Sequence, residues 1–97
     1  MVVLVERFEL HIPQARSLKQ KRHVVSPLCA MLRQTFQVSV AEVDHQNLWQ
    51  RATIAVAVVG RDAGHLAWVL QQIERRVEAW AELEVLDRVR DEWRPED

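Results

Sequence analysis

The chain has 97 residues and a net charge of −1, with 48% hydrophobic and 28% charged side chains, which is ordinary for one small soluble domain. It has no apolar run near the ~20 residues of a membrane span, no signal-peptide pattern, and a single cysteine, Cys29, which excludes an internal disulfide and a CxxC motif. We therefore expect one cytoplasmic domain over residues 1–97 that needs no metal or cofactor.

The first strand is predicted over residues 2–12, where apolar and polar side chains alternate. Glu6 is the one charged residue on its apolar face, and Pro13 ends the strand. The opposite face of this strand carries Val3, Val5, Arg7, Glu9 and His11.

A helix is predicted next, over about residues 18–36. Ser17 is its expected N-cap, and Gln20 completes a capping box. Pro27 interrupts the helical pattern and leaves a second interpretation open, in which Ser26 caps a shorter helix. Because the apolar stripe continues in register across the proline, we favour one kinked helix.

The remaining pattern predicts two strands near residues 37–44 and 51–59, a helix near 63–80 and a last strand over 83–89. The charged tail, about residues 91–97, is expected to fray. The order β-α-β-β-α-β, with right-handed crossovers, favours an α+β ferredoxin-like sandwich: a four-stranded antiparallel sheet with two helices on one face.

This fold places the strands over 2–12 and 51–59 at the centre of the sheet and leaves one sheet face uncovered. At one end that face is small and apolar, and Trp68 lies off the apolar stripe of the second helix. Exposed apolar patches are typical of interfaces, so we expect a homodimer. The candidate interface residues are Val3, Val5, Ala55, Ala57, Val59 and Trp68.

Positive charge is concentrated near the start of the first helix. No Asp or Glu occurs between Glu9 and Glu42, whereas five bases do: Arg16, Lys19, Lys21, Arg22 and Arg33. Bases at a helix N-terminus cost a few tenths of a kcal/mol each, so local stability does not favour them. The free N–H groups of that terminus suit phosphate. An anion site and a solvated basic face balanced by acids such as Glu42 and Asp44 both remain open.

The stretch SVAEVDHQNLWQRA, residues 39–52, joins the two middle strands. Asp44 and His45 resemble an acid–base pair, but adjacent residues of an extended chain point to opposite faces. The histidines lack metal-ligand spacing. Two interpretations remain: Asp44 as a turn residue with Trp49 folded over the hairpin onto the sheet edge, or a contact surface in which Gln50 and Arg51 supply donors and Trp49 a flat ring.

Three segments together resemble the YlxP-like family of small bacterial proteins of unknown function: LHIPQARSLKQKRHVV (10–25), VSVAEVDHQNLWQRATIAVAVV (38–59) and ELEVLD (82–87). The resemblance covers nearly the whole chain and implies a ferredoxin-like fold. Genes of that family often lie beside genes for transcription antitermination, translation initiation and ribosome-binding factors, which implies a role in ribosome maturation or RNA handling. The motif residues carried over by position are His11, Ser17, Lys19, Lys21, Arg22, Glu42, Asp44, Trp49, Gln50 and Arg51.

The sequence thus predicts a non-enzymatic RNA- or ribosome-associated protein that contacts phosphates through the start of its first helix. The expected RNA- or anion-binding residues are Arg16, Lys19, Lys21, Arg22, Trp49, Gln50 and Arg51. One alternative is a homodimeric protein-binding adaptor that binds no nucleic acid. The other is a small enzyme built around Asp44, His45 and Arg51.

Overall fold

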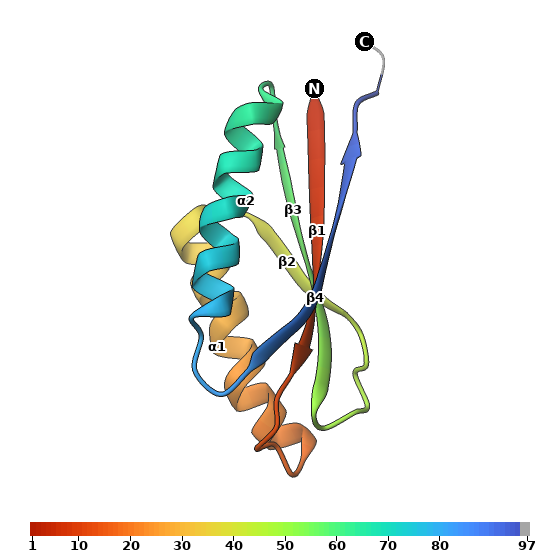
Figure 1. Ribbon diagram of the computed structural model, residues 1–97, viewed down its shortest axis with the longest axis vertical. Coiled ribbons are helices and arrows are strands. Elements are labelled where there is room, and N and C mark those ends of the chain that lie inside the picture. The colour runs from red at the N-terminus through yellow and green to blue at the C-terminus, as the bar shows by residue number, and fades with distance from the viewer. Residues whose placement is uncertain (96–97) are drawn as a thin grey trace.

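The computed structural model describes residues 1–95. Its elements are β1 (Val2–His11), α1 (Leu18–Phe36), β2 (Ser39–Asp44), β3 (Arg51–Gly60), α2 (Ala63–Glu78) and β4 (Glu84–Trp93). The strands form one antiparallel sheet in the order β2-β3-β1-β4, and both helices cover the same face of it (Figure 1). The predicted ferredoxin-like α+β fold is confirmed, with β1 and β3 at the centre.

The core lies between the sheet and the two helices. Alternate residues of β1 and β3 point into it, as their period of two predicts, and they meet the apolar stripes of α1 and α2. The fully buried side chains include Phe8, Leu10, Leu28, Leu32, Ile54, Leu70 and Ile73. Cys29 is also buried, and burial raises the pKa of its thiol. Within residues 1–95, no helix is long and apolar enough to cross a membrane.

Helix α1 continues through Pro27, so the prediction of one helix over residues 18–36, in place of a shorter helix capped by Ser26, is confirmed. Ser17 is the N-cap, as predicted: the backbone N–H of Gln20 donates to Ser17 Oγ at 3.1 Å. The Gln20 side chain accepts from the backbone N–H of Arg16 at 2.5 Å, one residue before the position that a capping box requires. Near the other end, Arg33 Nη2 donates to the backbone oxygen of Val40 at 2.7 Å. This bond satisfies an outward-facing carbonyl of the edge strand β2 and ties it to the helix.

Strand β4 is longer than predicted. It was expected to end at Val89 but continues to Trp93, which pairs with Val3 of β1. Of the tail 91–97 that was expected to fray, residues 91–93 therefore belong to the sheet, while residues 96–97 lie outside the described part of the chain. The other predicted bounds agree with the structure to within two residues.

A charged network joins β1, α2 and β4, and it includes Arg90, one residue beyond the predicted end of the strand. Glu6 is buried on the helix side of β1, and its Oε1 accepts from Arg90 Nε at 2.8 Å. Arg90 Nη2 also donates to Glu74 Oε2 at 2.9 Å. The neighbouring Arg88 pairs with the same helix: its Nη1 lies 2.8 Å from Glu74 Oε1 and 3.2 Å from Glu78 Oε1. Burial, followed by the adjacent Glu74 carboxyl, raises the pKa of Glu6 to about 7 in spite of Arg90.

Candidate nucleic-acid interface

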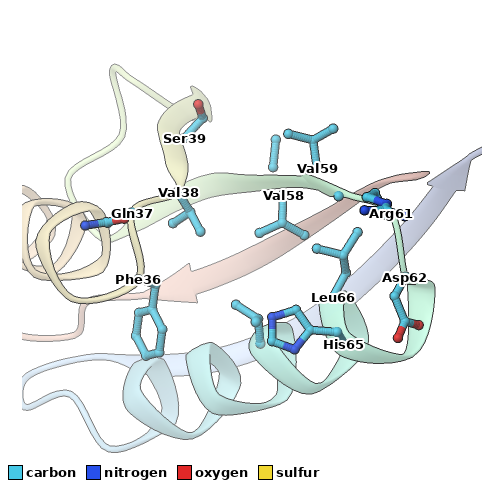
Figure 2. A pocket seen from close by; sticks show the side chains of 13 residues that line it. Phe36, Gln37, Val38, Ser39, Val58, Val59, Arg61, Asp62, His65 and Leu66 are labelled. Carbon is cyan, nitrogen blue, oxygen red and sulfur yellow. The ribbon is translucent and has the colours of Figure 1, made fainter. Parts of the chain in front are cut away.

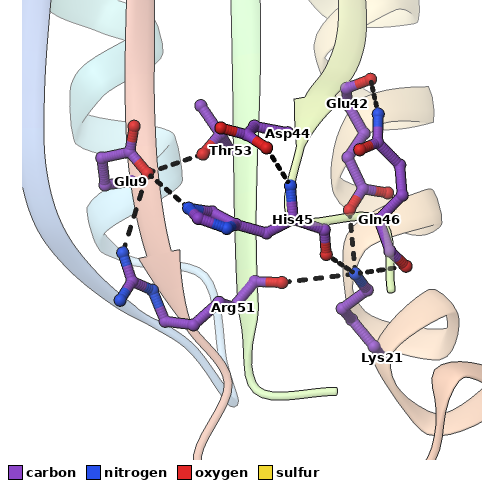
Figure 3. Close-up of polar contacts among 8 residues, drawn as sticks. All are labelled: Glu9, Lys21, Glu42, Asp44, His45, Gln46, Arg51 and Thr53. Atoms are coloured by element: carbon purple, nitrogen blue, oxygen red, sulfur yellow. Dashed lines mark hydrogen bonds and ion pairs between the residues drawn. The ribbon is translucent and has the colours of Figure 1, made fainter. Parts of the chain in front are cut away.

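Lys21 is buried, with 2% of its side chain exposed, and its ammonium lies among four acceptors (Figure 3). Nζ is 2.9 Å from Glu42 Oε2, 2.9 Å from the backbone oxygen of His45, 3.3 Å from that of Gln46 and 3.2 Å from that of Arg51. An ammonium has three N–H groups, so acceptors within the protein use all of them. The predicted phosphate contact of Lys21 is therefore corrected: this lysine is part of the interior.

Gln50 is a second residue whose predicted role changes. Its Nε2 donates to the backbone oxygens of Pro13 at 3.3 Å and Ala15 at 3.2 Å, and its own backbone oxygen accepts from the N–H of Ile12 at 2.9 Å. Together with Lys21, these bonds fasten the β2–β3 loop to the start of α1 and to the β1–α1 connection. Two segments about thirty residues apart in sequence thus form one end of the molecule (Figure 1).

The other three bases of the α1 start, Arg16, Lys19 and Arg22, are exposed. Within residues 1–95, none of them makes an ion pair, and the first turn of α1 contains no acidic residue. The acids that were expected to balance them have other partners. Glu42 binds Lys21, and Asp44 accepts a backbone N–H of its own turn.

Many of the other arginines have partners or favourable positions, although Arg7 and Arg61 make no ion pair within residues 1–95. Arg75 and Arg76 lie in the last turn of α2, where positive charge stabilises a helix. Several arginines of the sheet and the tail pair with carboxylates, namely Arg51 with Glu9, Arg88 with Glu74, Arg90 with Glu6, and Arg94 with Glu92. Arg16, Lys19 and Arg22 at the α1 start have neither kind of stabilisation.

The β2–β3 loop carries exposed apolar surface at this end of the molecule. Leu48 is exposed, and 54% of Trp49 is exposed beside a shallow hollow of about 380 Å³ lined by residues 47–51. This exposure favours the interpretation of the stretch as a contact surface over the one in which the Trp49 ring folds onto the sheet edge. His45, which adopts a left-handed backbone conformation with φ 62°, is the loop residue that folds over the sheet.

Asp44 and His45 do not form the acid–base pair considered from the sequence. Asp44 Oδ1 accepts the backbone N–H of His45 at 2.7 Å, whereas His45 Nε2 lies 3.8 Å from Glu9 Oε2 on β1 (Figure 3). Glu9 also accepts from Thr53 Oγ1 at 2.6 Å and lies 3.8 Å from Arg51 Nη2. Thr53 is buried, so this cluster offers no accessible nucleophile, and no group of three potential metal ligands occurs within residues 1–95.

Glu9 was not among the predicted site residues. The register of the predicted strands could have identified it, because Glu9 of β1 lies directly opposite Thr53 of β3, on the sheet face that the helices leave open. Trp68, in contrast, lies on α2, where its exposed ring stacks on His65 with 6.1 Å between ring centroids. The residues proposed for a dimer interface therefore fall on two different surfaces, the open sheet face and the helix layer.

A groove that the sequence did not predict lies at the end of β3 (Figure 2). Strand β2 begins at Ser39, opposite Ala57, so the last residues of β3 have no β2 neighbour. The groove holds about 320 Å³, and its apolar lining includes Phe36, Val38, Val58, Val59, Leu66 and Val69.

Comparison with known proteins gives two matches. A family model described as "Protein of unknown function (DUF503)" matches residues 3–90. The "Uncharacterized protein YlxP" of Bacillus subtilis (strain 168) is 31% identical over 76 residues, which cover 78% of this chain and 83% of the relative. The family match includes the α1 start and the β2–β3 loop, and the two matches confirm the resemblance seen in the three motif segments.

Proposed function

The chain belongs to the DUF503 family of proteins of unknown function, and for this member we propose binding of single-stranded RNA without catalysis. One observation carries the proposal: Arg16, Lys19 and Arg22 are exposed and lack ion pairs within residues 1–95, at the end of the molecule that also presents Trp49. The ribosome-associated role implied by the family resemblance is part of the same proposal.

Phosphate is the group that fits the α1 start. The first N–H groups of a helix have no partners within the helix, and together they carry about half a positive charge. Ser17 caps the N–H of Gln20 and its backbone oxygen accepts from Lys21, which leaves the N–H groups of Leu18 and Lys19 for a ligand. Three cations beside these groups favour a polyanion over a neutral ligand.

A nucleobase is the part of an RNA ligand that fits the β2–β3 loop. An exposed indole provides a stacking surface for any unpaired base, worth roughly 1–3 kcal/mol per base. The buried Lys21 and the bonds of Gln50 hold the loop against α1, so the ring and the cations are fixed relative to each other before binding. Because a base paired within a duplex cannot stack on a side chain, single-stranded RNA is favoured.

The test is a salt titration of affinity for a fluorescent single-stranded RNA. Each phosphate contact contributes about 0.7 to the slope of log affinity against log salt, so the variant Arg16→Glu/Lys19→Glu/Arg22→Glu should lose about 2 from that slope. Acids suit a helix start, so this variant should melt no lower than wild type. The control for charge is Arg61→Glu/Arg75→Glu/Arg76→Glu, which makes the same change in net charge at the two ends of α2 and should keep the slope. Because Arg75 and Arg76 stabilise the last turn of α2, this control should melt lower than wild type, and binding is compared well below its melting temperature.

The contribution of the loop is tested by Trp49→Ala. We expect weaker binding at every salt concentration with an unchanged slope, because stacking releases no counterions. Trp68→Ala removes an equally exposed indole from α2 and should bind as wild type does. The proposal is wrong if the α1 triple variant and its control bind RNA equally well.

A further inference from the structure

The sheet face opposite the helices is only partly covered. At one end the β2–β3 loop folds over it (Figure 1), so that His45 reaches Glu9 across β3 and Thr53 is buried beneath. The other end is open and presents a patch of small apolar side chains, Val3, Val5, Ala55, Ala57, Val59 and Val89. We call this patch the open patch.

The open patch is suited to face-to-face packing against a second β-sheet, because its side chains are small. Ala55 and Ala57 lie at its centre, and their β2 neighbours Ala41 and Ser39 are equally small. Side chains of this size allow two sheets to approach to about 10 Å. At the corner of the patch, Trp93 pairs with Val3 and has 61% of its surface exposed, which provides a large side chain for contact with a partner.

The charges of the open patch favour a copy of the same chain over RNA. Arg7 and Asp91 are its two charged residues, they have opposite signs, and neither makes an ion pair within residues 1–95. A two-fold axis brings the same surface of two molecules together, so a patch with one charge of each sign complements itself. A polyanion would instead meet no net attraction here.

The geometry points to a homodimer in which the open patches of two copies stack face to face, with Trp93 of each copy packed on the open patch of the other. The β2–β3 loops fix the orientation. If the strands of both copies ran in the same direction, the two loops would meet at the same end and keep the sheets apart. Opposite strand directions place each loop beyond the open end of the other sheet and leave the patches in contact.

The expected dissociation constant of the dimer follows from the surface area that the two copies bury. Four strands of about 4.8 Å spacing and five residues of about 3.3 Å rise give roughly 300 Å² of flat surface on each copy. Each Trp93 adds about 150–250 Å² of aromatic surface. The total, about 1,000 Å², lies at the low end for specific interfaces, so we expect a micromolar dissociation constant.

Sedimentation equilibrium of the full chain tests the dimer. The variants Trp93→Ala and Trp68→Ala each remove an exposed indole, the first from the open patch and the second from α2. Trp93→Ala should raise the dissociation constant about 30-fold, as loss of a buried aromatic anchor does, and Trp68→Ala should leave it unchanged. The reverse pattern would place the interface on the helix layer and overturn the proposal.

A second pair of variants distinguishes the contribution of the open patch to dimerisation from that of the rest of β4. Val89→Glu introduces a charge within the open patch, next to Arg7, whereas Leu86→Glu introduces the same charge at the bulge of the same strand. Only Val89→Glu should abolish dimerisation, and equal melting temperatures for the two variants would show that folding is intact. A wild-type protein that remains monomeric at about 500 µM would refute the proposal.

Discussion

Replacement of Lys21 by methionine removes one ammonium and keeps the length of its apolar stem. In the variant, the Glu42 carboxylate loses its cation, and the backbone oxygens of His45, Gln46 and Arg51 lose a donor. The loss affects the fold itself, because these bonds join the β2–β3 loop to α1.

The size of the effect follows from burial. Removal of one partner from a buried ion pair costs about 3–5 kcal/mol, since the other charge is left without compensation. The side chain of Glu42 is 25% exposed, so water reaches the freed carboxylate and the lower value, about 3 kcal/mol, applies. For a domain of this size each kcal/mol lowers Tm by roughly 4–8 °C, which predicts a fall of about 12–24 °C.

Urea unfolding followed by circular dichroism measures this cost. Lys19→Met is the matched control, because it removes the same charge from an exposed position two residues earlier and should change stability by less than about 0.5 kcal/mol. A cycle with Glu42→Gln should give a coupling energy of about 1–3 kcal/mol for the pair. Equal unfolding free energies for Lys21→Met and Lys19→Met would refute the buried role of Lys21.

Three further predictions concern pH, chemistry and metals. The pKa of Glu6 is raised from 4.5 to about 7, so the folded state binds this proton more tightly than the unfolded state does. The contribution of Glu6 to the free energy of unfolding is therefore complete below about pH 4.5 and is lost as pH rises through 7, by about 3 kcal/mol in all. Urea unfolding at pH 5 to 8 measures this dependence, and the variant Glu6→Gln should flatten it. His45→Ala should leave RNA affinity nearly unchanged, and a loss of any turnover in that variant would favour the enzyme alternative. Dialysis against EDTA should not change Tm, because no metal-ligand spacing occurs in the sequence; a drop of several degrees would show a bound metal.

The elements of the fold follow from local sequence patterns. The period of two in β1 and β3, the N-cap at Ser17 and the apolar stripe that crosses Pro27 are all local features, and each predicted its element correctly. The end of β4 was missed because it depends on a distant contact. Arg90 pairs with Glu6, which is 84 residues away in sequence.

The candidate site was predicted less well, because the roles of its residues depend on neighbours from other segments of the chain. Lys21 belongs to a run of bases in the sequence, and only its rotation about the helix axis distinguishes it from the exposed Lys19. The acceptors that surround it come from residues 42–51, and the bonds of Gln50 go to the β1–α1 connection. Glu6 was recognised as the one charged residue on the apolar face of β1, but its partners Arg90 and Glu74 could not be identified from the sequence pattern.

NMR titration of the ¹⁵N-labelled protein with a single-stranded RNA of about ten nucleotides, at physiological salt, tests most directly whether the α1 start and the β2–β3 loop bind RNA. We predict saturable shifts of the backbone amides of residues 16–22 and 46–51 and of the Trp49 indole N–H, while the amides around Trp68 stay in place. Shifts confined to the open patch or to α2, or no shifts at all, would contradict RNA binding at this end of the molecule.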